Sequence, residues 1–381
     1  MPLHPVDYAS FSIFTSFSLA LGLYYSTCKK KDTTRCNDRK RPTSGRSGLQ
    51  HEEVFLGGRS IPSWQLAISV LASVATGVGV VSHSAHQYAY GFHFAWHIAA
   101  MALATPCIVY FFLPVLYELK VTSVFEYLRM RFGNLMGISA SLIYFFFSQI
   151  LGAVSIYSAA VGMSTMLDIP LFVCDMAIGL LGTSYTALGG LRGVVWADCV
   201  QGIVLFAAPF VIIGKILYDS AHLDVPLKPL SNIDTKQAFL RLEADVSSDE
   251  TVWACAVASV PFHLVREGMD QIVAQRFLAA RSIRSARRVL WAGTSMLAFF
   301  ILSTSLTGLA LTYWYRNCDP MLTGAITRYD QLVPFYVGES LANVAGLRGL
   351  FLSGLVGASI STVSSVVNMQ PHSTWTLSPR T

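Results

Sequence analysis

The sequence predicts an all-α protein that crosses a membrane several times, and three observations support this fold class. Of the 381 residues, 53% are hydrophobic and only 13% are charged, whereas soluble globular proteins contain about 25% charged residues. Apolar runs of roughly 20 residues, the length of a membrane-spanning helix, recur along the whole chain. Basic residues gather in alternate connecting segments, as in membrane proteins of fixed orientation. We therefore expect a polytopic helical protein without a large soluble domain.

Nine apolar stretches are long enough to be spans. They cover residues 8–26, 64–86, 94–116, 137–166, 170–188, 193–218, 251–273, 289–315 and 347–369. The first also has the length of a signal peptide. Because a basic cluster follows it and no basic segment precedes it, we interpret it as a span.

The net charge of +5 is concentrated in loops that we expect to face the cytoplasm. The loop of residues 27–63 is strongly basic, and the other inside loops carry Lys120, Arg129, Arg131, Arg192, Arg276, Arg281, Arg284, Arg287 and Arg288. The outside loop, residues 219–250, is mixed and mostly acidic. Positive loops stay in the cytoplasm, so we expect an outside N-terminus and a cytoplasmic C-terminus. Because this basic cluster lies beside a membrane span, we do not interpret it as a nucleic-acid site. The expected partner of the chain is the lipid bilayer.

Enzyme chemistry is disfavoured by what the sequence lacks. The seven cysteines show no metal-ligand spacing, and most lie inside apolar runs, where free Cys behaves as a small hydrophobe. We find no nucleophile–base pair and no phosphate-binding loop. Single histidines at span ends, such as His97 and His263, are more typical of hydrogen-bonded structural residues than of catalysts. We expect no enzyme activity and no cofactor.

Two of the nine spans are interrupted. The second carries Gly77 and Gly79 in mid-membrane, and the seventh is broken by Pro261 and Gly268. Irregular backbone persists at membrane depth only where protein or a water-filled cavity satisfies the freed polar groups. A matching pair of broken spans is the sequence pointer to an inverted-repeat transporter with its binding site near the midplane.

The last span, GLFLSGLVGASISTVSSVVN, combines small residues with many hydroxyls. Ala358, Ser361, Thr362 and Ser365 follow the spacing of one helix face. One interpretation is close helix packing, with hydroxyls bonded back to their own helix. The other is a cation site, in which hydroxyls and carbonyls freed by the broken second span supply oxygen ligands. The two interpretations are compatible.

At these residues the chain resembles the sodium:solute symporter family, in its multivitamin, monocarboxylate and iodide branch. The resemblance rests on the last span and on the stretches PVDYASF, FLGGRSIP, YTALGGLRGVVWADCVQG, IVAQRFLAARS and NCDPMLTGAITRYDQLVPFYV. It covers nearly the whole chain up to Asn368. It implies a LeuT-type fold of two inverted five-helix repeats after an extra N-terminal helix.

Applied to this chain, the resemblance implies six segments. They are the outside N-terminus with the first span (1–26), the basic cytoplasmic loop (27–63), the first repeat (64–218), the extracellular loop (219–250), a partial second repeat of three helices (251–369) and a polar tail (370–381). The family continues into further spans where this chain turns polar, so the sequence resembles a form truncated at the C-terminus.

The resemblance also implies a sodium site. Its ligands are the carbonyls of Ala72, Ala75 and Ala358 and the hydroxyls of Ser361 and Thr362. The family most often has Ser at the last of these positions, and Thr362 keeps the hydroxyl.

Three further residues receive roles from the resemblance. Asp198 lies on the sodium path toward the cytoplasm, or is an interfacial carboxylate paired with a nearby Arg. Thr76 and Gly79 border the substrate cavity, or serve packing and a kink.

The seventh span departs from the family pattern, which is uncharged near Gly268. Here Arg266 and Glu267 precede Gly268, and Asp270 stands where the family usually has Asn. Arg266 and Asp270 have helical i,i+4 spacing, so we expect them to form a structural pair. The alternative is a cation that faces an anionic substrate, with Gly268 and Asp270 at the cavity. Buried charges in a membrane are costly and are usually paired or functional.

Together these features predict sodium-coupled symport of a small anionic solute across the plasma membrane by alternating access. Biotin, pantothenate, lactate-like acids and iodide all remain open as solutes. The alternative is a non-transporting truncated form that acts as a regulatory partner or has no activity.

Overall fold

The computed structural model describes residues 3–375 except for 18, 21–23, 25–60, 120, 122, 224–226, 228–238, 244 and 246, and it leaves undescribed the side chains of 185–194, 368 and 370–375. Most of the basic loop and the last part of the polar tail therefore lie outside the described residues. The described part is helical and contains no strand, which confirms the all-α prediction for it.

The first half of the chain forms an N-terminal helix and seven α-helices joined by shorter helical turns. These are residues 5–17, α3 (Ser63–Val74), η3 (Gly79–His83), α4 (Ser84–Tyr90), η4 (His93–Trp96), α5 (His97–Cys107), η5 (Ile108–Phe112), α6 (Leu113–Glu118), α7 (Val124–Phe132), α8 (Asn134–Leu167) and α9 (Leu171–Ala221).

The second half contains two long helices and a chain of short ones. These are η7 (Ala254–Ala258), α11 (Val260–His263), η8 (Leu264–Met269), α12 (Gln271–Leu278), α13 (Ile283–Trp314), η9 (Tyr315–Asn317), η10 (Tyr329–Gln331), α14 (Leu332–Ser340) and α15 (Leu347–Trp375).

Five described helical stretches are long and apolar enough to cross a membrane. They are His93–Glu118, Asn134–Leu167, Val195–Ala221, Ile283–Asn317 and Leu347–Val367, and a sixth is the bent pair Ser63–Val74 and Gly79–Tyr90. Each corresponds to one of the nine expected spans. Of the other three, the first lies partly outside the described residues, the fifth is the short apolar stretch Leu171–Ser184, and the seventh is broken.

The second span is interrupted where its glycines predict. The axis turns by 59° between α3 and the helical stretch that begins at Gly79. Because Gly77 and Gly79 have no side chain, neighbouring helices pack closely against the backbone at the bend. A Cβ on Gly77 would lie 2.7 Å from the side chain of Leu355, and one on Gly79 would lie 2.7 Å from the ring of Phe300.

The seventh span is broken in two places. Two π-helical turns, η7 and η8, flank the single α-helical turn that contains Pro261. At Asp270 the backbone becomes extended, with φ −61° and ψ 123°, before α12 begins. Proline lacks an N–H and crowds the preceding turn, which accounts for the wide turn before it.

Helix α9 is one element with two arms that correspond to two expected spans. Gly182 packs against Ile360 and Val363, while Asp198 bonds to Ser361. About 24 Å of straight helix would separate Gly182 from Asp198. Because both positions contact the same turn of α15, α9 is not straight and its arms lie along one partner.

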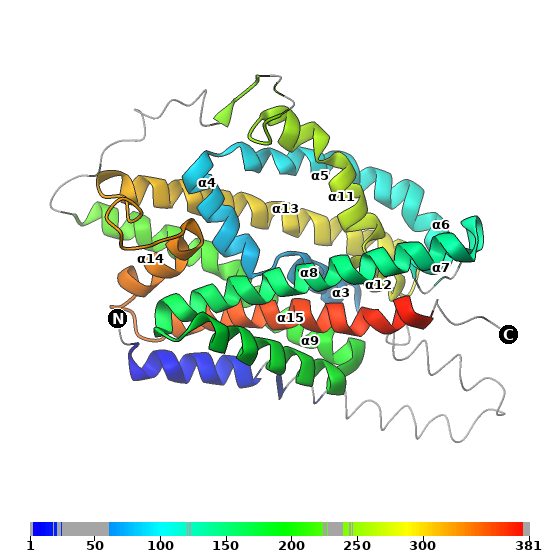
Figure 1. Cartoon of the computed structure of the whole chain (residues 1–381), viewed down its shortest axis with the longest axis horizontal. Helices are drawn as coiled ribbons and strands as arrows, with labels where there is room; N and C mark the ends of the chain where they lie inside the picture. The colour runs from blue at the N-terminus through cyan, green and yellow to red at the C-terminus, as the bar shows by residue number, and fades with distance from the viewer. Residues whose placement is uncertain are drawn as a thin grey trace.

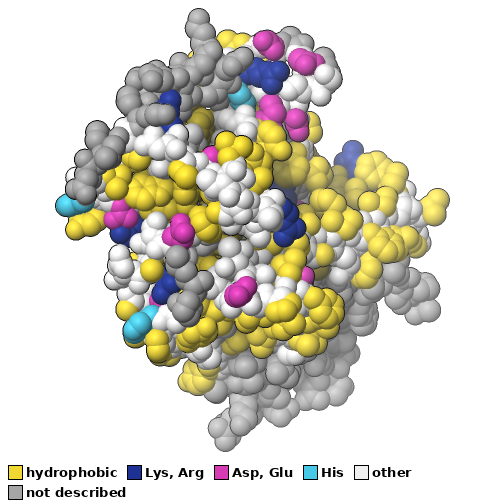
Figure 2. Space-filling view, turned by 60° about the vertical axis from the view of Figure 1, so that its left-hand side comes forward, with side chains coloured by type: hydrophobic (Ala, Val, Ile, Leu, Met, Phe, Trp, Pro, Cys, Tyr) yellow, Lys and Arg dark blue, Asp and Glu magenta, His cyan; other side chains and the backbone are white. Residues whose placement is uncertain are grey.

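Helix α15 is the centre of the molecule. It runs between α8 and α9 (Figure 1). In its apolar membrane-spanning stretch 89% of the residues are buried, against 22% in that of α8. Helix α8 instead exposes a face that includes Leu135, Ile143 and Ile150, which are 81%, 71% and 61% exposed. Broad apolar areas with scattered charges also cover the face in Figure 2. Such surfaces suit contact with lipid.

The N-terminal helix is fastened to the turn before α15. Asp7 accepts hydrogen bonds from the backbone N–H of Gly346, at 2.8 Å, and from Arg348, whose Nη2 lies 3.0 Å away. Ser10 donates to the carbonyl of Gly346 at 2.9 Å. The two helices touch at Gly349, where an added Cβ would clash with the carbonyl oxygen of Asp7.

We expect Gly349→Ala to reduce stability by about 1–3 kcal/mol, because the added methyl forces these backbones apart. The measurement is the thermal unfolding midpoint of the purified chain in detergent. Gly214→Ala is the matched control, since a Cβ there meets nothing within 4 Å. Equal midpoints for the two variants would contradict the close contact.

Candidate functional site

The end of α3 presents backbone oxygens that the helix does not use. At Ala75 the chain leaves the helix, with φ −78° and ψ 90°. The N–H of Ala75 still bonds to the carbonyl of Leu71 at 2.7 Å, but the carbonyls of residues 72–75 accept no backbone hydrogen bond from the described residues. The carbonyls of Ala72 and Ala75, two of the expected sodium ligands, are therefore among those that the break frees.

The hydroxyl face of α15 points into the protein. Ala358, Ser361 and Thr362 are each at most 2% exposed. The hydroxyl of Thr362 donates to the carbonyl of Ala358 at 3.0 Å, so these two expected ligands lie side by side. Ser361 donates instead to Oδ1 of Asp198 at 2.5 Å. The buried face and the bond from Thr362 back to Ala358 agree with the helix-packing interpretation, and the cation-site interpretation stays a prediction.

The contacts also show how α3 and α15 are aligned. Asp198 accepts hydrogen bonds from Ser69 of α3 and Ser361 of α15, which places these serines at one level. Just beyond the end of α3, Gly77 packs against Leu355 of α15. The two helices therefore run antiparallel, so Ala72, one turn after Ser69, is at the level of Ala358, one turn before Ser361.

Asp198 and Arg276 form a fully buried ion pair beside this level. Arg276 Nη2 lies 3.2 Å from Asp198 Oδ2, and the two side chains are 1% and 0% exposed. Ser69 also donates to Asp198 Oδ2, at 2.5 Å. Of the two interpretations of Asp198, the partner arginine is present, and the sodium-path role stays a prediction.

Arg276 corrects the charge assignment made from sequence. We counted it among the basic residues of a cytoplasmic loop, but it lies on α12, inside the protein. Its guanidinium donates to Ser69 Oγ at 2.9 Å, Ile272 O at 2.5 Å and Ser365 Oγ at 2.8 Å, in addition to Asp198. Arg281, Arg284 and Arg288 are exposed, and the last two lie near the start of α13.

Asp270 has structural partners on every side. It caps α12 by accepting from Ile272 N at 2.9 Å, it accepts from the hydroxyl of Tyr144 at 2.5 Å, and it pairs with Arg266 as the i,i+4 spacing predicts. Gly268 lets η8 approach the third span, because a Cβ there would lie 2.8 Å from Ile108.

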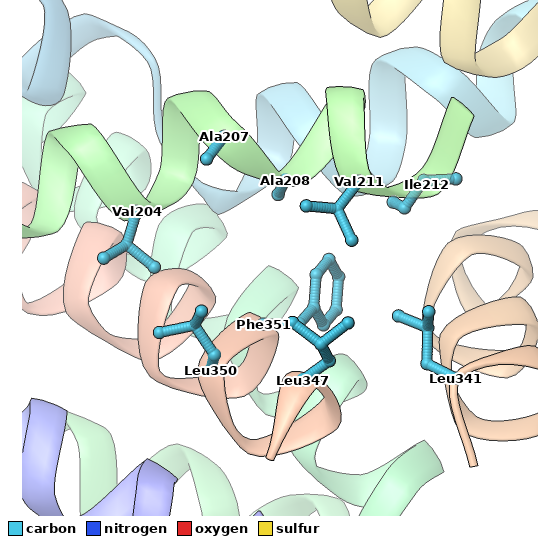
Figure 3. Close-up of a pocket in the computed structure, with 9 residues that line it drawn as sticks. All are labelled: Val204, Ala207, Ala208, Val211, Ile212, Leu341, Leu347, Leu350 and Phe351. Carbon is cyan, nitrogen blue, oxygen red and sulfur yellow. The ribbon is translucent and has the colours of Figure 1, made fainter. Parts of the chain in front are cut away.

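The structure thus explains Gly79, Gly268 and Asp270 by packing and capping, and Thr76 is half-buried at the bend. Their assignment to a substrate cavity stays a prediction. A pocket elsewhere between α9 and α15 is entirely apolar, lined by Val204, Ala207, Ala208, Val211, Ile212, Leu341, Leu347, Leu350 and Phe351 (Figure 3). It offers no polar group to an ion and does not contain any expected site residue.

Sequence reasoning missed a second buried polar group, formed by His97, His263 and Glu267. His97 and His263 lie 3.2 Å apart, and His263 contacts Glu267 at 2.9 Å. The i,i+4 spacing of His263 and Glu267 was a usable signal. The contact with His97, on another helix, had none.

Comparison with known proteins identifies the group to which this arrangement belongs. The model of the sodium:solute symporter family matches residues 54–375. The chain belongs to the sodium:solute symporter family. Curated symporter relatives include a Drosophila melanogaster protein named for sodium-dependent multivitamin transport, 29% identical over 95% of this chain, and the human sodium/iodide cotransporter, 28% identical over 83%. Bovine sodium-coupled monocarboxylate transporter 2 is 27% identical over 95% of this chain.

The chain spans about half the length of these curated relatives. The matched part covers 57%, 49% and 56% of the three, in the order given. Among solved structures, a Na+-coupled sialic acid symporter in a substrate-bound outward-open state matches with a TM-score of 0.83 at 23% identity. That match covers 97% of this chain and 74% of the other. The described part of the chain therefore has the helical transporter fold predicted from its sequence.

We expect Arg276→Met to destabilise the protein by about 3–5 kcal/mol, because it leaves Asp198 buried without its countercharge. In the double variant Asp198→Asn with Arg276→Met, much of this loss should be recovered. The coupling energy comes from thermal unfolding of four purified proteins: the unchanged chain, Arg276→Met, Asp198→Asn and the double variant. Arg284→Met, at an exposed position, is the control. Strict additivity of the two single changes would show that the ion pair is not coupled.

Proposed function

We propose that this chain carries the sodium site of a symporter that moves a small anionic solute through the plasma membrane by alternating access. The observation that carries the proposal is the buried hydroxyl face of α15 at the level of the unused carbonyls of α3. The membership of the family and the names of the relatives support sodium as the coupling ion.

The chemistry of the expected ligands suits a monovalent cation. The ligand set consists of neutral oxygens: the carbonyls of Ala72, Ala75 and Ala358 and the hydroxyls of Ser361 and Thr362. Each hydroxyl has one proton to donate and two lone pairs. The hydroxyl of Ser361 donates its hydrogen bond to Asp198, and that of Thr362 donates to the carbonyl of Ala358. Both hydroxyl oxygens therefore keep lone pairs for an ion.

The ion would add a further link between the break of α3 and α15. Sodium between the break of α3 and α15 stabilises one arrangement of these helices, and an arrangement favoured by sodium also changes solute affinity. Linkage requires the two effects to be reciprocal. The membrane potential adds about 2.3 kcal/mol per charge per 100 mV to inward movement. Asp198, next to the ligands, is the carboxylate along the path to the cytoplasm.

The solute class follows from the relatives, whose names give a multivitamin, iodide and monocarboxylates. We propose a small anion bordered by Thr76 and Gly79 at the bend of α3 and by the segment of Gly268 and Asp270. A panel of iodide, lactate, biotin and pantothenate, tested for sodium-driven uptake into vesicles that contain the purified chain, tests both the function and the solute.

We expect Thr362→Ala to raise the sodium concentration for half-maximal binding about tenfold or more, which corresponds to about 1.4 kcal/mol. Thr362→Ser should retain most of the affinity because it keeps the hydroxyl. Radioactive sodium binding to the purified chain is the measurement. Ser353→Ala is the control on the same helix, since that hydroxyl bonds back to Leu350. If the control and Thr362→Ala lose affinity equally, Thr362 is not a ligand.

We also propose that the N-terminus and the segment before α14 face outward. Cys318 is exposed in that segment, whereas Cys28 and Cys36 belong to the basic first loop. An impermeant thiol reagent added to intact cells should label the chain, and Cys318→Ser should abolish the labelling. Labelling that persists in Cys318→Ser and disappears after removal of Cys28 and Cys36 would reverse the orientation.

A further inference from the structure

Three titratable side chains form a continuous hydrogen-bonded row from the start of α5 into the broken seventh span. Nδ1 of His97 lies 3.2 Å from Nε2 of His263, and Nδ1 of His263 lies 2.9 Å from Oε1 of Glu267. His97 is partly exposed, whereas His263 and Glu267 are 5% and 2% exposed. The row therefore has one accessible end and one buried end.

At the buried end of the row, an ionised Glu267 carries a negative charge, and no Lys or Arg in the described part of the chain pairs with it. If both imidazoles are neutral and carry their proton on Nδ1, each donates to the next member and Glu267 is an ionised carboxylate. Its second oxygen, Oε2, is buried and has no hydrogen-bond partner among the described residues. A buried carboxylate without a countercharge is costly in a membrane protein.

The charged groups around Glu267 are engaged with other partners and do not neutralise its carboxylate. On the same segment, Arg266 is paired with Asp270. On α12, Arg276 is engaged with Asp198. At the other end, His83 and His86 are near enough to interact electrostatically with His97, and His86 contacts Glu250 at 3.1 Å. The elements that pack on η8 from the third span do so through apolar contacts such as Ile108.

We propose that Glu267 is a proton-binding site, loaded from the outer side through His97 and His263. A proton binds Nε2 of His97, His97 passes its Nδ1 proton to Nε2 of His263, and His263 passes its Nδ1 proton to Oε1 of Glu267. One proton is taken up, and the products are a neutral carboxylic acid and two neutral imidazoles in the other tautomer. The buried charge is neutralised, and no bond other than N–H and O–H changes.

This site has a consequence that rests on the proposed function. Glu267 directly precedes Gly268, in the segment that we place beside the anionic solute. A neutral Glu267 does not repel an anion, whereas the carboxylate does. Proton and anion therefore bind with positive, reciprocal coupling, and uptake of the anion increases as the outside becomes more acidic.

The first experiment is independent of transport. Infrared spectra of the purified chain between about pH 5 and 8, the range in which imidazoles ordinarily titrate, should show the carbonyl band of a protonated carboxylic acid growing as pH falls. Glu267→Gln should remove this band, and the control Glu118→Gln, at an exposed position, should retain it. An unchanged band in Glu267→Gln overturns the proposal.

A second variant guards against misfolding of Glu267→Gln. His97→Gln leaves Glu267 and His263 in place but interrupts the row at its accessible end. The band should remain, and its appearance after a rapid drop in pH should be at least severalfold slower than in the unchanged chain. Equal rates would exclude His97 as the route.

The coupling to the anion is tested with iodide, lactate and biotin as probes in vesicles with a sodium gradient. Lowering the outside pH should raise uptake severalfold in the unchanged chain and have no effect in Glu267→Gln. A pH effect retained in Glu267→Gln overturns the coupling. Absence of sodium-driven uptake for all probes would contradict the proposed function, while the infrared result would still decide the proton site.

Discussion

The structure depends on one buried ion pair, Asp198 with Arg276. Removing two charges from water is expensive, and only close geometry with further hydrogen bonds compensates for it. Here Ser69 and Ser361 donate to the carboxylate, and Ser365 accepts from the guanidinium. Four helices, α3, α9, α12 and α15, supply these groups, so the requirement to satisfy one pair fixes their relative positions. The oxygens of the candidate sodium site lie at the levels that this arrangement sets.

A second constraint is that every backbone polar group at membrane depth needs a partner. In the described residues regular helices satisfy most of this requirement, and the larger departures are the bend after Val74 and the segment of η7, α11 and η8. At the first break the unused carbonyls lie at the level of the hydroxyl face of α15, where we propose that an ion binds. At the second, Asp270 caps the restarted helix with its side chain. The breaks are therefore the positions at which the fold has polar atoms to offer, and both proposed binding events occur there.

The two buried carboxylates show how environment separates chemical roles. Asp198 has a countercharge in Arg276 and two hydroxyl donors, Ser69 and Ser361, so it serves as a fixed anchor. Glu267 has one imidazole partner and, among the described residues, an unsatisfied oxygen, which is why we propose it as the proton-binding site. The seventh span departs from the family pattern at Arg266, Glu267 and Asp270. Two of these three residues neutralise each other, which leaves Glu267 as the one that alters the chemistry of this segment.

The sequence by itself determined the helical class, most helix positions, the broken second span and the hydroxyl face of α15. These are local properties, because span length, glycine placement and the 3.6-residue period are all set by neighbours along the chain. It also predicted the pair of Arg266 and Asp270, which lie one turn apart. Only the tertiary structure decided that Arg276 is buried against Asp198 and that His97 meets His263. Those partners are far apart in sequence, and their meeting depends on how helices are packed and aligned, which no local pattern records.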